Sequence, residues 1–233
     1  MRLTGLSALM LLAACSAEKA PEPQPTPAPT RAEPRTLIPA DLDPEADGLR
    51  VKGTGITDAL IGSEKAPIAR YDAFVLCADE AIAVCDPELL PADTVYTYML
   101  TITPLAPASV SSPAPTRDES GADNLVQSVA PAELVRTLRP VPEFKGEVGF
   151  AMAQAAAALG GDDALSVTLD ENRLVWRVTR GSWKPGLPIT VWWRSARPPA
   201  KPAPAYRLEL GGKSVNVTAP FPADKPVERG AAR

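Results

Sequence analysis

Apolar and polar residues alternate most clearly between Thr94 and Thr103, with the two-residue period of a β-strand. One face of this stretch carries aromatic and aliphatic side chains: Tyr96, Tyr98, Leu100 and Ile102. The opposite face carries more polar ones: Val95, Thr97, Met99, Thr101 and Thr103. β-Branched and aromatic residues favour strands, and Pro104 ends the stretch because proline donates no ladder hydrogen bond. The pattern therefore predicts a strand over residues 94–103.

Similar patterning or β-forming composition predicts further strands in both halves of the chain: 49–57, 71–77, 165–169, 174–178, 189–195, 206–210 and 213–219. Short turns separate two pairs of these strands. One turn is Asp170-Glu171-Asn172, and the other is Gly211-Gly212, a two-residue sequence typical of tight hairpins. The C-terminal part is therefore expected to contain two β-hairpins.

Helix is predicted in two places. Alanine-rich residues 148–159 are followed by Gly160-Gly161, which is a common helix stop. Residues 131–138 predict a short helical turn, either capped by Ser128 or opened by Pro131. With the strands, this composition predicts a mainly β fold: an antiparallel, sandwich-like body with one short helix, on a disordered, proline-rich N-terminal stalk.

Changes in composition suggest boundaries along the chain, because Pro- and Ser-rich stretches are typical of linkers. The expected segments are a signal peptide (1–14), a lipid-anchored proline-rich linker (15–48), a first β unit (49–104), a second linker (105–124), a second β unit with a short helix (125–221) and a disordered tail (222–233). Within the first linker, prolines recur at alternate positions from Pro21 to Pro29. Such a segment favours extended polyproline II and would hold the body away from a membrane.

The N-terminus has the pattern of an export signal. Arg2 precedes an apolar run from Leu6 to Ala14, which is shorter than the roughly 20 residues that span a bilayer. The end of this run and the next residue, Leu12-Ala13-Ala14-Cys15, resemble the lipobox of bacterial lipoproteins. The resemblance implies cleavage before Cys15 and two or three acyl chains on that residue, enough for stable anchoring. It also implies the outer membrane, facing the periplasm, because Ser16 stands where an Asp would favour inner-membrane retention.

An anchored Cys15 leaves one pair of cysteines, Cys77 and Cys85. Exported bacterial proteins meet an oxidising periplasm, so this pair predicts a disulfide. Two free thiols or a metal pair are the alternatives. Zinc would need further Cys or His ligands, and the chain contains no histidine. We therefore predict no metal site and no cofactor.

The aromatic residues suggest a surface. All four tryptophans lie between Trp176 and Trp193. Burial in the core is the more usual role of tryptophan in a small β domain; the alternative is a binding surface, for which Trp183, Trp192 and Tyr206 are the candidates. Because Trp192 and Trp193 are neighbours on a predicted strand, they point to opposite faces. We expect Trp193 to point inward, in phase with Val191, and Trp192 to be the more exposed.

Catalytic motifs are absent from the sequence. Without histidine there is no Ser-His-Asp triad, and no glycine-rich phosphate loop follows a predicted strand. The formal charge of −4 gives no general attraction to nucleic acid. The expectation is a membrane-anchored envelope lipoprotein with a non-catalytic binding or structural role towards an envelope protein or a glycan. The alternatives are a carboxylate-dependent periplasmic hydrolase and an accessory subunit of an envelope assembly or secretion machine.

Overall fold

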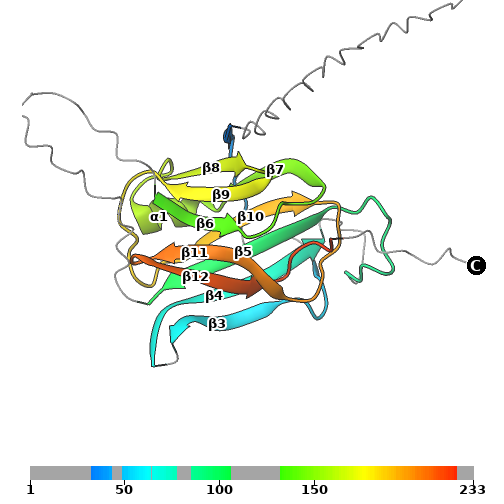
Figure 1. Cartoon of the computed structure of the whole chain (residues 1–233), viewed down its shortest axis with the longest axis horizontal. Coiled ribbons are helices and arrows are strands. Elements are labelled where there is room, and N and C mark those ends of the chain that lie inside the picture. The colour runs from blue at the N-terminus through cyan, green and yellow to red at the C-terminus, as the bar shows by residue number, and fades with distance from the viewer. Residues whose placement is uncertain (1–32, 44–48, 64, 78–84, 106–131, 225–233) are drawn as a thin grey trace, which may run out of the picture. The chain divides into compact units, whose positions relative to one another are not determined.

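The computed structural model describes residues 33–43, 49–63, 65–77, 85–105 and 132–224, and these residues form a mainly β structure with one helix (Figure 1). Two antiparallel sheets pack as a sandwich, which confirms the predicted fold class. Cys15, the predicted signal peptide, most of the predicted stalk and most of the predicted tail lie outside the described residues.

The first sheet, called sheet A, has the order β1-β8-β9-β6-β11-β12. Its strands are β1 (Arg35–Leu37), β8 (Leu165–Asp170), β9 (Arg173–Val178), β6 (Ala132–Thr137), β11 (Ala203–Leu210) and β12 (Lys213–Ala219). Sheet B has the order β2-β4-β5-β10-β7, with β3 also paired to β4. Its strands are β2 (Leu49–Arg50), β3 (Ile56–Ser63), β4 (Ala66–Cys77), β5 (Tyr96–Pro104), β10 (Ile189–Ser195) and β7 (Phe144–Phe150).

Both predicted hairpins are present. β8 and β9 are joined by Glu171 and Asn172, and both residues have positive φ, at 50° and 59°. Gly211 and Gly212 join β11 to β12 with φ of 57° and 72°. Positive φ at both central residues matches the right-handed twist of the flanking strands, so local sequence sets the register of both hairpins.

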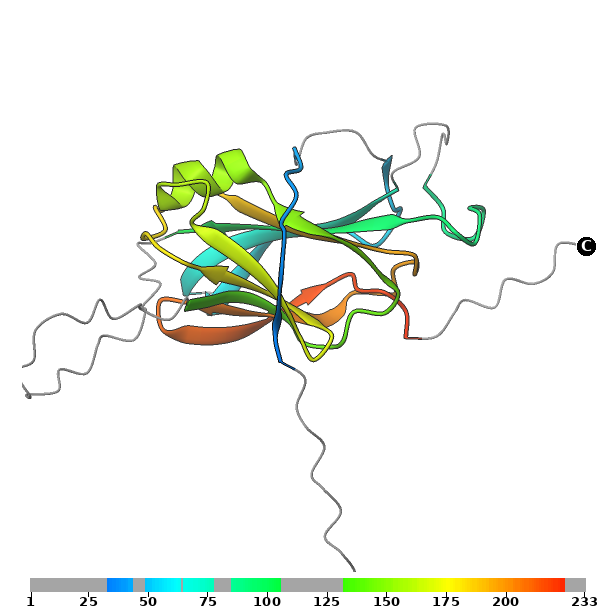
Figure 2. The ribbon, with the colours of Figure 1, turned by 90° about the horizontal axis from the view of Figure 1, so that it is seen from above.

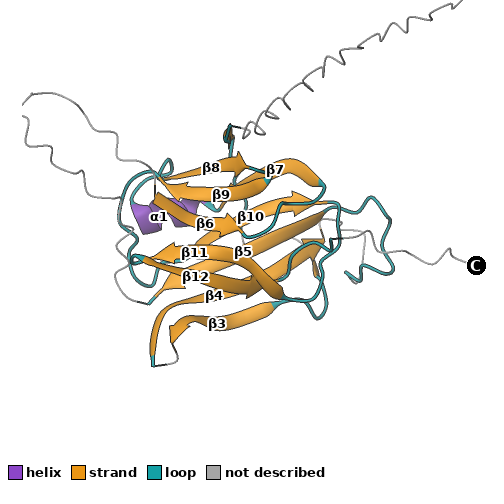
Figure 3. Cartoon of the chain, in the orientation of Figure 1, coloured by secondary structure: helices purple, strands orange, loops and turns teal. Residues whose placement is uncertain are grey.

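The two β units expected on either side of residues 105–124 form one sandwich. In sheet B, β10 pairs on one side with β5, from the first expected unit, and on the other with β7, from the second. Figure 2 shows the two sheets as facing layers, and Figure 3 shows how little of the described chain is helical. Each layer therefore depends on pairings between residues far apart in sequence.

The structure corrects the helix predictions and part of the linker. The helical turn expected at 131–138 is wrong, because β6 occupies Ala132–Thr137 and pairs with both β9 and β11. The helix expected from residue 148 begins later: α1 spans Met152–Leu159, since the preceding residues extend β7 beside β10. Residues 35–37, assigned to the linker, form β1 at the edge of sheet A.

Polar bonds cross the core between the two sheets. The Trp193 Nε1–H of β10 donates to the hydroxyl of Tyr206 in β11 at 3.0 Å, and Trp176 Nε1–H in β9 donates to the carbonyl of Gly149 in β7 at 3.0 Å. Both tryptophans are fully buried. A buried indole N–H without an acceptor destabilises the folded protein. The two tryptophan rings therefore fill the core, and their hydrogen bonds hold the two sheets in alignment.

Burial raises the pKa of the Tyr98 and Tyr206 hydroxyls above the ordinary value near 10. When folding raises the pKa of a group, the stability that the group contributes is fully present below the pKa it has in the unfolded chain. This contribution is lost as pH rises above that value. We therefore expect the free energy of unfolding to fall above about pH 10, and Tyr206→Phe to lessen this fall. Near neutral pH the same variant should cost roughly 1–3 kcal/mol, because it leaves Trp193 Nε1 unpaired. Urea unfolding across the alkaline range tests this, and an unchanged alkaline profile in Tyr206→Phe would contradict it.

Candidate functional site

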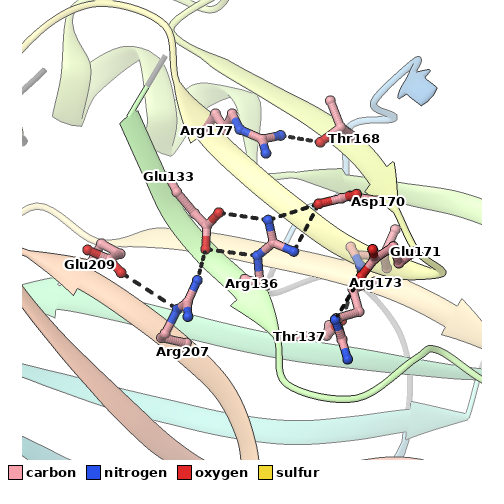
Figure 4. A network of polar contacts seen from close by, with 11 residues as sticks. Glu133, Arg136, Thr137, Thr168, Asp170, Glu171, Arg173, Arg177, Arg207 and Glu209 are labelled. Atoms are coloured by element: carbon pink, nitrogen blue, oxygen red, sulfur yellow. Dashed lines mark hydrogen bonds and ion pairs between the residues drawn. The ribbon is translucent and has the colours of Figure 1, made fainter. Parts of the chain in front are cut away.

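The outer face of sheet A carries a network of paired charges (Figure 4). A β-bulge between Glu133 and Val135 places Glu133 and Arg136 on the same face of β6. The Arg136 guanidinium donates two hydrogen bonds of 3.0 Å to the Glu133 carboxylate and two of 3.1 Å to Asp170 Oδ2. One arginine thus joins carboxylates on β6 and β8 across the intervening β9.

The network extends to β11, where Arg207 donates to Glu133 Oε1 at 2.9 Å. Burial raises the pKa of Glu133, but the hydrogen bonds and charges of Arg136 and Arg207 outweigh this effect, so its pKa is lowered overall. A general acid needs a raised pKa instead. The ion network therefore favours the charged form of Glu133, and it joins β6, β8 and β11 across this face of the sheet.

The outer face of sheet B has a different character. Phe74, Met99, Trp192 and Gly149 lie directly opposite one another in register, forming a row across β4, β5, β10 and β7. Four residues of this face form a second hydrophobic cluster separate from the main core, here called the outer cluster: Phe74, Leu76, Met99 and Trp192. The outer face of a sandwich sheet is usually polar, so an apolar row that is buried there, with Leu42 packed against its cluster, is a candidate site for binding a further segment.

Cations and an unpaired donor accompany the outer cluster. The Arg50 guanidinium lies over the Phe74 ring, 4.0 Å from its centroid, and that of Arg194 lies 5.7 Å from the Trp192 centroid. Arg194 also donates to Thr97 Oγ1 at 3.2 Å and pairs with Glu147. Within the described part of the chain, the buried Trp192 Nε1–H has no hydrogen-bond partner. This face therefore contains a donor that an acceptor on a bound molecule would satisfy.

The residues predicted to form an aromatic surface do not lie on one. Trp183, Trp192 and Tyr206 are exposed by only 1%, 2% and 1%. Trp183 donates to the carbonyl of Leu187 at 2.9 Å, and Tyr206 accepts from Trp193 in the core. Trp193 does point into the main core, as expected. The expected exposure of Trp192 is wrong, because sheet B is covered on both faces.

The predicted cysteine pair is present. Cys77, the last residue of β4, is joined to Cys85 in a disulfide with 6.0 Å between the Cα atoms. Both cysteines are buried against the main core. The bridge therefore holds the end of β4, next to Leu76 of the outer cluster.

Sequence reasoning missed three members of the outer cluster: Phe74, Leu76 and Met99. One signal for them exists in the predicted strand 71–77. Its continuous run Ala73-Phe74-Val75-Leu76-Cys77 has apolar residues on both faces, which is typical of a strand buried on both sides. Met99 carries no such signal, because threonines flank it on its face of β5.

Within the described ranges, no three or more Cys, Asp or Glu side chains gather in a way that could hold a metal ion. Among the same residues, no helix has the length and apolar character needed to cross a membrane. No protein-family model matches the chain, and comparison with curated proteins and with solved structures gives no significant match.

Proposed function

We propose that the chain is a lipid-anchored envelope lipoprotein whose β-sandwich has a non-catalytic binding or structural role. The observation that carries this proposal is the sequence Leu12-Ala13-Ala14-Cys15 directly after a short apolar signal segment. Acyl chains on Cys15 would hold the protein on the membrane, and Ser16 favours the outer membrane, facing the periplasm. The partner would be another envelope protein or a glycan.

Two features of the sandwich support binding over hydrolysis. The charged face of sheet A is occupied by its own ion pairs, and the pKa of the Glu133 carboxylate there is lowered. The outer face of sheet B instead combines aromatic side chains, two arginines and an unpaired indole N–H. Such a mixture is common where proteins bind other proteins.

Replacing the lipidated cysteine tests the anchor. Cys15→Ser should remove the acyl chains, so an alkyne fatty-acid analogue should label the wild-type protein but not the variant, and the variant should leave the membrane pellet. Ser16→Ala keeps the cysteine and should remain labelled and membrane-bound. Labelling of Cys15→Ser at the wild-type level, or no labelling of the wild type, would refute lipidation at this residue.

A further inference from the structure

The segment that follows β1 pairs with the free edge of β7, the last strand of sheet B, and then reaches the outer face of that sheet. The Ala40 N–H donates to Val148 O at 2.9 Å, and Ala40 O accepts from Phe150 N at 3.4 Å, so this residue sits beside Gly149 at the end of the apolar row. A Cβ on Gly149 would clash with the Ala40 carbonyl. Two residues further on, Leu42 packs against the outer cluster. We call residues 39–43 the strap.

An acidic residue of the strap caps the helix. α1 has no side-chain cap of its own and no acidic residue in its first turn. The carboxylate of Asp41 supplies this contact from 111 residues away, where its Oδ1 accepts from Met152 N at 2.8 Å. A helix N-terminus favours negative charge. Two side chains of the strap thus bind neighbouring elements: Asp41 at the start of α1 and Leu42 on the outer cluster.

The strap buries little of its own surface, although the outer cluster beneath it is buried. Ala40, Asp41 and Asp43 are exposed, and Leu42 is only half-buried. Beneath it, Trp192 is 2% exposed and its Nε1–H has no acceptor within the described part of the chain. Segments with few buried apolar contacts open at a lower free energy than the core of a protein. A segment that also offered an acceptor to Trp192 would bind this face better than the strap does.

We propose that the outer face of sheet B binds an extended segment of a partner protein carrying an Asp-Leu pair, and that the strap occupies this face as a displaceable internal mimic. The partner's aspartate takes the place of Asp41 at the N-terminus of α1, and its leucine takes the place of Leu42 on the outer cluster. A backbone carbonyl of the partner accepts from Trp192 Nε1. This inference rests on the proposed binding role but is independent of the lipid anchor.

The test uses the full chain in mild detergent and a fluorescent peptide with the strap sequence Ile-Pro-Ala-Asp-Leu-Asp, residues 38–43. Asp41→Ala/Leu42→Ser removes the contacts of Asp41 with α1 and of Leu42 with the outer cluster, and should loosen the strap enough for a peptide to compete with it. Fluorescence anisotropy should show this variant binding the peptide at least about tenfold more tightly than wild type, in which the strap competes. A control peptide, Ile-Pro-Ala-Asn-Ser-Asp, should not bind. A folded variant that binds neither peptide, or both equally, would overturn the proposal.

Hydrogen exchange of the wild-type chain provides a second measurement that does not depend on the variant folding. The amides of Ala40 and Met152, whose bonds depend on the strap, should exchange at least about 100-fold faster than that of Leu100 in the centre of sheet B. Exchange of all three at the rate of global unfolding would mean that the strap is a fixed part of the fold, and would overturn the proposal. Neither measurement involves Cys15, so failure here is distinguishable from failure of the anchor.

Discussion

Replacement of Trp193 by alanine is expected to lower the free energy of unfolding by about 3–5 kcal/mol, the range for removing a large buried aromatic side chain. Trp193 is 1% exposed. Its ring stacks on Tyr98 with centroids 4.8 Å apart and lies 5.4 Å from Phe221. Its indole N–H makes the bond to Tyr206 that joins the two sheets. The substitution would remove all of these interactions and leave a cavity between the layers.

Its neighbour offers a matched comparison. Trp192 is equally buried, but it belongs to the smaller outer cluster and its Nε1–H has no partner among the described residues. Trp192→Ala should therefore cost less than Trp193→Ala, and Trp192→Phe should cost little, because it removes an unpaired donor while keeping an aromatic ring. Urea unfolding with the disulfide oxidised measures all three variants. A larger loss for Trp192→Ala than for Trp193→Ala would contradict the assignment of Trp193 to the main core.

Removal of Arg136 should have the next largest effect, about 2–4 kcal/mol. This is slightly below the range for breaking a fully buried ion pair, because the pair remains partly exposed to solvent. The side chains of Arg136 and Asp170 are exposed by 16% and 4%. Arg136→Ala removes the four hydrogen bonds that this guanidinium donates to Glu133 and Asp170. The two carboxylates then repel each other on a half-buried face.

The pH dependence of Arg136→Ala gives a second readout. The pKa of Glu133 is lowered in the folded protein, so its contribution to stability is present above its ordinary pKa and is lost as pH falls through the lowered value. Arg136→Ala should therefore lose less stability on acidification than wild type does. Arg207→Ala serves as the control, since Arg207 is more exposed and makes one hydrogen bond to Glu133; its cost should be under about 1 kcal/mol. Thermal melts from neutral to acidic pH test both variants, and equal costs would contradict the central place of Arg136.

Local patterns in the sequence determined much of the sandwich. Gly211-Gly212 and the alternation on either side specify the β11–β12 hairpin, because a two-residue turn with positive φ sets the register of its strands. β10 occupies the same residues as its prediction, Ile189–Ser195. Gly160, in the left-handed conformation, ends α1 where the sequence predicted a stop. Each of these features depends on residues close together in the chain.

Tertiary contacts decided the rest, and these join residues far apart in sequence. Residues 132–137 have enough helical character to suggest a turn, but pairing with β9 and β11 makes them a strand. The charge network on sheet A requires the bulge at Glu133, which appears only when β6 meets β9. The sequence predicted Trp192 to be the more exposed tryptophan, because its own strand places polar residues on the same face. In the fold, residues of β4, β5 and the strap bury it. A periodic pattern specifies the face to which a side chain points, but what covers that face is determined by segments that fold back from elsewhere in the chain.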